Sequence, residues 1–314
     1  MTKLEKIITS FPPIAFVIKK SKKIIIPGFQ GIPLHDVTIF FIQQIKKIGL
    51  NERAAAIAFN LIMALPATML FLFSIIPYFP KFLKIKLQIL SLFKDISPNS
   101  NTYKFIANLM DDLMTRNVGI FSFGFLLIIF YASNAMMAFI RTFDKSIREN
   151  EIFFLHQRWR AIRLTTILML LIISTTLVLL GQEQLAALIR KVFHLKKRTV
   201  LPWLNFVRWS IIISLFFLGI AFIYRYAPSV KKKWDLISPG SVLATLLTLC
   251  TTLIFSYWVN NFASYNKVYG SIGTVLILML IIYINAFILL IGFELNVSIT
   301  YLSKHAKEKH KFHK

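Results

Sequence analysis

Cysteine, acidic residues and charge in general are scarce in this chain of 314 residues. The single cysteine, Cys250, lies inside an apolar run, which excludes a disulfide framework and a cysteine-based metal site. Charged residues make up 16% of the chain, against about 25% in a soluble globular domain, while hydrophobic residues reach 56%. Low charge argues against intrinsic disorder, and the apolar excess is too large for a water-soluble fold.

The apolar residues come in blocks about 20 residues long, the length that a helix needs to cross a hydrocarbon core roughly 30 Å thick. We therefore predict an all-α, polytopic membrane protein with six transmembrane helices. The strands of a membrane barrel would alternate polar and apolar residues, and these blocks do not. The six predicted spans are Ala54–Tyr78, Val118–Ile140, Leu164–Leu180, Trp203–Tyr226, Leu236–Trp258 and Gly273–Tyr301.

Lysine and arginine are distributed unequally between the two sides of these spans. The N-terminal stretch, the second and fourth connections and the tail together hold 24 of them, whereas the other connections hold 12. Because positive residues are retained on the cytoplasmic side, both termini are predicted to be cytoplasmic, which requires an even number of spans. The predicted division is a cytoplasmic N-terminal segment (1–53), a six-helix transmembrane domain (54–302) and a basic cytoplasmic tail (303–314).

Three segments outside the spans have a recognisable pattern. Asp36–Leu50 predicts a short amphipathic helix that either lies on the cytoplasmic leaflet or packs against the bundle. Residues 79–117 predict an outer helical hairpin, either a lid or a passive cap, divided at Ser97-Pro98-Asn99. The tail carries five lysines and three histidines, and without accompanying carboxylates we interpret it as a solvated basic segment rather than a metal site.

Five polar residues inside the predicted spans are candidates for a functional cavity, because polarity is expensive at membrane depth. Asn60 and Asn134 each lie about six residues from a cytoplasmic end. Glu294 and Asn296 reach a similar depth on the last span, and Asn285 lies deeper. The depths predict a polar cavity that opens to the cytoplasm. The alternatives are that these residues join helices to one another, and that Glu294 pairs with a cytoplasmic-side cation.

Two further groups mark candidate helix breaks and a candidate entrance. Proline inside a helix removes a backbone hydrogen bond, so Pro66, and Pro239 with Gly240, are candidate breaks. The last outer connection carries residues that either line an entrance or form an ordinary membrane boundary. These residues are Tyr265, Tyr269, Gly270 and Gly273.

The sequence indicates no cofactor, no metal site and no nucleic-acid partner. Basic residues occur in every cytoplasmic connection, as topology requires, without an aromatic-interleaved basic face. Acids and histidines are not clustered as metal-dependent hydrolysis needs, and neither a GxSxG motif nor a phosphate-binding glycine loop is present. We expect membrane lipids as partners, with anionic headgroups at the cytoplasmic basic loops. Protein partners are not indicated.

Motifs in the first half of the chain and in the fourth connection resemble a known family. The run Ala54-Ala55-Ala56, Ala58-Phe59 and then Pro66 is similar to the start of the first span in the YihY/BrkB family of bacterial inner-membrane proteins. Phe59 and Asn60 stand where that family has an aromatic pair. The segment Tyr226–Gly240, with Pro228 and Trp234, is similar to the family's loop into the fifth span.

The most specific resemblance lies toward the C-terminus. Phe262–Tyr265 and Tyr269–Gly273 resemble the family's YGSLG region, and residues 292–296 resemble its GAELN signature, with Phe293 where alanine is common. The resemblance covers roughly Asp36 to Leu302. It implies a six-helix integral protein of the bacterial plasma (inner) membrane. It implies no agreed activity, because members carry either an old ribonuclease label or a virulence-factor label.

These observations leave two main hypotheses for function. The first is binding or transport of a lipid or small solute through the helix bundle, which would make the chain a candidate transporter. The alternative is a structural or assembly factor of the cell envelope, in which the polar residues only join helices. A membrane ribonuclease is the least favoured reading, since the sequence lacks a catalytic cluster.

Overall fold

The structure of the chain is a computed structural model. It describes residues 19–78, 83, 86–87, 90, 100–114, 118–147, 154–193, 197–230, 233–261 and 265–312. For parts of the helices, chiefly 176–202 and 259–275, it describes the backbone but not the side chains. The described residues form helices joined by short connections, and they include no strand. The elements are α3 (Leu34–Ile48), α4 (Leu50–Ile75), η1 (Ile76–Tyr78), α6 (Ser100–Leu113), α7 (Val118–Ile147), α8 (Phe154–Phe193), α9 (Lys197–Tyr226), α10 (Pro239–Asn261) and α11 (Tyr265–Phe312).

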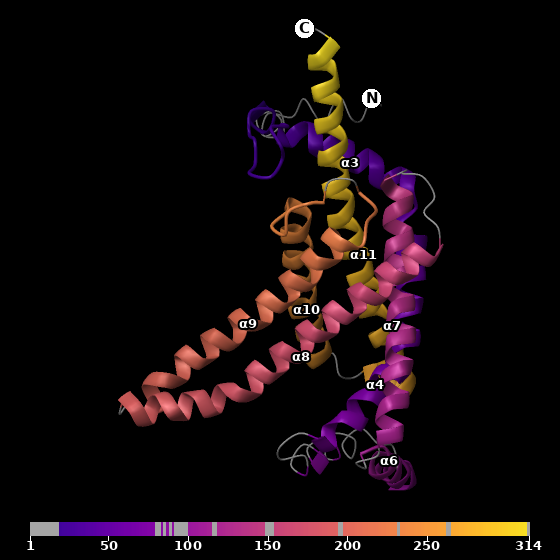
Figure 1. The fold of residues 1–314 in the computed structure, drawn as a ribbon, viewed down its shortest axis with the longest axis vertical. Coiled ribbons are helices and arrows are strands. Elements are labelled where there is room, and N and C mark those ends of the chain that lie inside the picture. The colour runs from indigo at the N-terminus through magenta and orange to yellow at the C-terminus, as the bar shows by residue number, and fades with distance from the viewer. Residues whose placement is uncertain are drawn as a thin grey trace.

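The helices divide into an upright group, which includes α4, α7 and α11, and an inclined pair formed by α8 and α9 (Figure 1). In the upright group, α4 packs against both α7 and α11. Helices α8 and α9 pack against each other and lean away from α4 and α7 toward their shared tip (Figure 1). Helix α7 contacts α8, and α10 contacts both α9 and α11, so the inclined pair is joined to the upright group along two edges.

The predicted all-α membrane class is confirmed. Within the described residues, five helical segments are long and apolar enough to cross a bilayer: Leu50–Tyr78, Val118–Ile147, Trp209–Tyr226, Pro239–Trp258 and Leu276–Ala306. Each of them overlaps one of the predicted spans. The remaining predicted span, Leu164–Leu180, falls on α8, whose side chains are described only as far as residue 175.

Aromatic and small side chains fill the core where α4, α7 and α11 meet. Ala54, Ile57 and Ala58 recur at helical spacing on α4 and are buried, which lets the helix approach its neighbours closely. Phe143 of α7 stacks on Phe293 of α11 with ring centroids 3.6 Å apart. Phe293, at the position where the related family commonly has alanine, is therefore a central core residue of this chain.

Helices α10 and α11 cross at two glycines. A Cβ atom on Gly240 would lie 2.0 Å from the carbonyl oxygen of Gly292, and a Cβ on Gly292 would lie 2.5 Å from the Tyr224 hydroxyl. No larger residue fits at either position without moving backbone. Close backbone approach at small residues is the usual way in which membrane helices associate.

The predicted amphipathic helix is confirmed as α3. It ends at Gly49, whose φ of 64° suits a glycine in the left-handed C-cap conformation. Val37 is buried against α11, and the Phe40 ring stacks on Tyr301 at 5.0 Å between centroids. The packing alternative is thus supported, while Ile39 and Ile42 stay exposed and are available to a leaflet surface.

The outermost segments are described in part. Helix α6 covers the second half of the predicted outer hairpin, whereas most of residues 79–99 lie outside the described residues. Lys86 pairs with Asp111 of α6 at 2.5 Å. Helix α11 has 48 residues and is therefore about 72 Å long, more than twice the hydrocarbon thickness. It continues through the predicted basic tail as far as Phe312.

Candidate functional site

A buried carboxylate joins three of the upright helices. Glu294 of α11 is fully buried, and its Oε1 accepts a hydrogen bond of 2.5 Å from the Ser146 hydroxyl of α7. The same hydroxyl accepts a bond of 2.7 Å from the Arg53 guanidinium of α4. Arg53 therefore compensates the carboxylate through a serine rather than through a direct ion pair. The other oxygen, Oε2, has no hydrogen-bond partner among the described residues.

Asn296 holds the start of α10. Its Oδ1 accepts the Gly240 N–H at 2.8 Å, and its Nδ2 donates to the Ser238 hydroxyl at 2.9 Å. Ser238 and Ser241 cap the helix reciprocally, each hydroxyl accepting the other residue's backbone N–H, in the manner of a capping box. Pro239 occupies the first helical position, where its missing N–H costs nothing. Pro239 and Gly240 thus begin α10 and lie at its junction with α11.

Asn134 of α7 binds an arginine. Its Oδ1 accepts a hydrogen bond from the Arg158 guanidinium of α8, and the same guanidinium lies over the Phe130 ring, 5.1 Å from its centroid. Two residues along α8, Arg160 instead pairs with Asp144 of α7 at 3.0 Å. These neighbouring arginines therefore have different kinds of partner, a neutral amide for one and a carboxylate for the other.

Asn60 and Asn285 turn back onto their own helices. The Asn60 amide donates to the Ala56 carbonyl, and the Asn285 amide donates to the Ile281 carbonyl, each at 2.8 Å. No hydrogen bond joins any two of the five predicted cavity residues, all of which the structure describes. The structure brings Asn296 together with Pro239 and Gly240, and it gives Glu294, Asn134, Asn60 and Asn285 separate partners.

The structure gives fewer contacts for the other candidates, Pro66 and the four residues of the candidate entrance. Pro66 lies inside α4, which continues through it as one helix. The four residues of the candidate entrance, Tyr265, Tyr269, Gly270 and Gly273, lie in the first turns of α11. Their side chains are outside the described residues, so the entrance stays a prediction.

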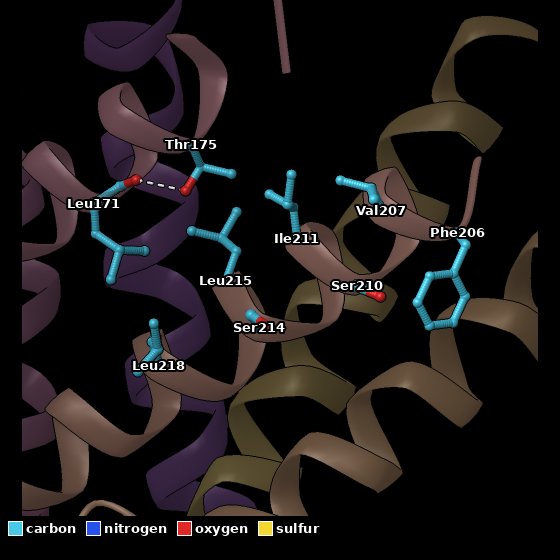
Figure 2. Close-up of a pocket in the computed structure, with 9 residues that line it drawn as sticks. All are labelled: Leu171, Thr175, Phe206, Val207, Ser210, Ile211, Ser214, Leu215 and Leu218. Carbon is cyan, nitrogen blue, oxygen red and sulfur yellow. Dashed lines mark hydrogen bonds between the residues drawn. The ribbon is translucent and has the colours of Figure 1, made fainter. Parts of the chain in front are cut away.

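An open groove of about 320 Å³ lies between α8 and α9. Figure 2 shows α8 contributing Leu171 and Thr175 on one side and successive turns of α9 forming the rest. The Thr175 hydroxyl donates to the Leu171 carbonyl at 2.8 Å, so its polarity is satisfied within its own helix. The full lining is Leu171, Thr175, Phe206, Val207, Ser210, Ile211, Ser214, Leu215 and Leu218.

Several of these features were absent from the sequence-based candidates. Ser146, Arg158 and the pair of Asp144 with Arg160 were not singled out, nor was the groove. Asp144 carried a usable signal, because acids are scarce in this chain, with 13 Asp and Glu against 37 Lys and Arg. In the part of the chain that is described, no three His, Cys, Asp or Glu side chains gather closely enough to hold a metal ion.

Comparison with known proteins adds relatives of two kinds. YfkH of Bacillus subtilis strain 168, whose name describes it as ribonuclease-like, is 25% identical over 248 residues, or 78% of this chain and 88% of that protein. The UPF0761 membrane protein IL2447 of Idiomarina loihiensis is 33% identical over 95 residues, 30% of this chain and 34% of that protein. A UPF0761 membrane protein of Pseudoalteromonas translucida is 29% identical over 82 residues, 26% of this chain and 27% of that protein.

No solved structure matches the chain. Residues 41–314 match the family described as virulence factor BrkB, which covers all the membrane-capable helices and the sites at Glu294, Asn296 and Arg158. The match extends over far more than half of the chain, in agreement with the motifs of the first and last spans. The chain belongs to the BrkB family of integral membrane proteins.

Proposed function

We propose that this chain binds a lipid or a small solute within its helix bundle and moves it, and that the groove between α8 and α9 holds an acyl chain. The observation that carries the proposal is the composition and size of the groove. Six of its nine lining residues are apolar and three carry hydroxyls, and its volume of about 320 Å³ falls in the range of small-ligand sites.

The location of the groove favours an acyl chain as the occupant. Five lining residues of α9 lie within the membrane-capable segment Trp209–Tyr226, where the surrounding solvent is lipid. The groove is open to that solvent, and one of its three hydroxyls, that of Thr175, is already bonded to a backbone carbonyl of its own helix. A polar solute would find few donors and acceptors there, whereas an acyl chain needs only apolar contact.

The proposal assigns no catalytic step to the chain. A relative is named ribonuclease-like, but RNA hydrolysis needs carboxylates available to a metal or to water. The two acids best placed within the helices are not available in this way, the first because it is bonded and the second because it is buried. Asp144 accepts from Arg160 and from the Ser229 N–H, and Glu294 is buried against Ser146.

The proposal includes residence in the bacterial plasma (inner) membrane with both termini in the cytoplasm. Its support is the excess of Lys and Arg in alternate connections. It also draws on the position of α3 and the last turns of α11, which lie at the same end of the molecule (Figure 1). Labelling of single cysteines introduced at Thr38 and Lys304, in intact and in permeabilised cells, tests this orientation in a Cys250→Ser background.

Filling the groove tests the proposed function. Ser214→Phe places a ring in the groove, and Ile213→Phe places the same ring one residue away, at an exposed position outside the lining. Native mass spectrometry of protein released in mild detergent, with analysis of retained lipids, should show a lipid bound to the wild type and to Ile213→Phe and lost from Ser214→Phe. A transport assay in proteoliposomes with the identified lipid follows. Equal retention by both variants would contradict the proposal.

A structural or assembly role is the second candidate, and the polar contacts favour it. Asn296 joins α10 to α11, and Glu294 joins α11 to α7 through Ser146. If this is the whole role of the chain, only bulk phospholipid should be retained. Variants of Asn296 and Glu294 should then lose folding and phenotype together, whereas a folded variant without phenotype supports a binding function.

A further inference from the structure

Arg158 is held in a fixed place by two neutral groups of α7. Its guanidinium donates to the Asn134 Oδ1 and lies over the Phe130 ring, 5.1 Å from the centroid. An arginine has five N–H donors, and one of them is used here. The contacts orient the planar fork and leave most of its donors for another acceptor.

No carboxylate of the described residues pairs with Arg158. The neighbouring Arg160 shows the usual arrangement, with Asp144 at 3.0 Å and a second bond to the Ala227 carbonyl at the same distance. Asp144 also accepts from Gln157 and from the Ser229 N–H, so its oxygens are already engaged. The positive charge of Arg158 is thus held beside an amide and a ring, and no carboxylate of the described residues forms an ion pair with it.

The position of Asn134 puts this charge beside the uncharged stretch of α7. Helix α7 has no charged residue from Val118 until Arg141, which is seven residues after Asn134. At 1.5 Å per residue, the Arg158 guanidinium therefore lies about 10 Å inside the uncharged stretch of α7. An unpaired cation at such depth is costly, and bilayers respond by local thinning that brings headgroups or water to it.

The surface beside Arg158 is apolar and exposed. Phe130 is 52% exposed, and Leu126, one turn earlier on α7, is 65% exposed. At the start of α8, Leu155 and Trp159 are exposed as well, and tryptophan is typical of the headgroup level. A lipid can therefore approach the guanidinium from the membrane along an apolar surface.

We propose that Arg158, oriented by Asn134 and Phe130, forms a binding site for the phosphate group of a membrane phospholipid. The guanidinium fork matches phosphate oxygens in pairs, as an ammonium does not. A phosphate in this site lies below the usual headgroup plane on the cytoplasmic side. The lipid that carries it is therefore displaced from its normal position in the leaflet toward the bilayer centre. This inference rests on the proposed lipid-binding function and names the headgroup chemistry that the apolar groove does not recognise.

Titration with paired lipids tests the site. Purified, delipidated protein in mild detergent is titrated with phosphatidylglycerol and with diacylglycerol of the same acyl chains, and binding is followed by native mass spectrometry. Arg158→Gln should weaken phosphatidylglycerol binding more than tenfold and leave diacylglycerol binding unchanged. Arg163→Gln, which removes an exposed arginine of the same helix, should change neither by more than about twofold, because no contact among the described residues orients that guanidinium as Asn134 and Phe130 orient Arg158.

Two control experiments distinguish a lipid phosphate from free phosphate and allow for a variant that does not fold. Inorganic phosphate at millimolar concentration should not displace phosphatidylglycerol, and displacement at a comparable affinity would overturn the assignment to a lipid. Arg158→Lys keeps the charge but loses the fork, so an intermediate weakening supports the site if Arg158→Gln does not fold. Equal weakening by Arg158→Gln and Arg163→Gln overturns the proposal. Failure of the wild type to bind diacylglycerol would instead count against the groove.

Discussion

Replacing Gly240 by alanine should destabilise the protein through one added methyl group. The new Cβ would lie 2.0 Å from the Gly292 carbonyl oxygen and 2.7 Å from the Asn296 Oδ1. The first of these atoms belongs to the backbone of α11, so it cannot rotate away. Helices α10 and α11 must therefore separate at their crossing.

The magnitude follows from what the separation disturbs. Overpacking of a well-packed core costs typically about 1–3 kcal/mol. Asn296 also bonds the Gly240 N–H at 2.8 Å and Ser238 at 2.9 Å, and each weakened bond adds about 1 kcal/mol. We expect Gly240→Ala to lower the free energy of unfolding by about 3 kcal/mol or more.

Gly219 offers a matched control within α9. A Cβ there meets only the Leu168 Cδ2 atom, at 3.9 Å, which is an ordinary contact. Alanine in a helix interior is more favourable than glycine by about 0.5–1 kcal/mol. Gly219→Ala should therefore be neutral or slightly stabilising, opposite in sign to Gly240→Ala.

Thermal unfolding of both variants in one detergent, followed by loss of the monodisperse peak in gel filtration, measures the difference. The midpoint should fall by several degrees for Gly240→Ala and stay level or rise for Gly219→Ala. Equal midpoints for Gly240→Ala and the wild type would refute the close crossing of α10 and α11.

The remaining predictions use the same unfolding measurement. Asp144→Asn removes the charge partner of Arg160, which is only 16% exposed, and should cost about 2 kcal/mol; an unchanged midpoint would show that the pair is not formed. Asn296→Ala leaves the Gly240 N–H without its acceptor and removes the bond that Asn296 donates to the Ser238 hydroxyl, so it should cost about 2–4 kcal/mol, whereas Asn285→Ala removes only a bond within its own helix and should cost much less; equal effects would contradict the capping role. Tyr224→Phe removes a bond of 2.6 Å to the Leu289 carbonyl and should lower the free energy of unfolding by about 1 kcal/mol. An unchanged midpoint would show that this bond does not stabilise the protein.

The helices of this fold are largely predictable from the sequence. Apolar length determines where a chain crosses a bilayer, and five predicted spans coincide with membrane-capable helices. The amphipathic pattern of Asp36–Leu50 predicted both ends of α3 within about two residues, because its apolar residues recur at helical spacing on one face. Helix length beyond the membrane was less predictable, since α11 continues into a basic segment that composition alone assigns to solvent.

The candidate site was predictable in depth but not in direction. Counting residues from the ends of the predicted spans places Asn60 and Asn134 at one level, yet Asn60 bonds its own helix and Asn134 binds Arg158. The direction of a side chain depends on how each helix is rotated against its neighbours, and that rotation is decided by contacts between distant segments. The groove has the same origin, because it belongs to neither α8 nor α9 alone.

The two arginines at the start of α8 show why polarity at depth is an incomplete guide to function. Arg158 and Arg160 are two residues apart and so point about 200° apart around the helix. Arg160 meets the carboxylate of Asp144, whereas Arg158 meets the neutral amide of Asn134. Glu294 and Asn296 likewise satisfy structural needs of α7 and α10. Arg158, a cation outside the predicted spans, thus lies beside the uncharged stretch of α7 without a carboxylate partner among the described residues, and the phosphate that we propose for it comes from the bilayer.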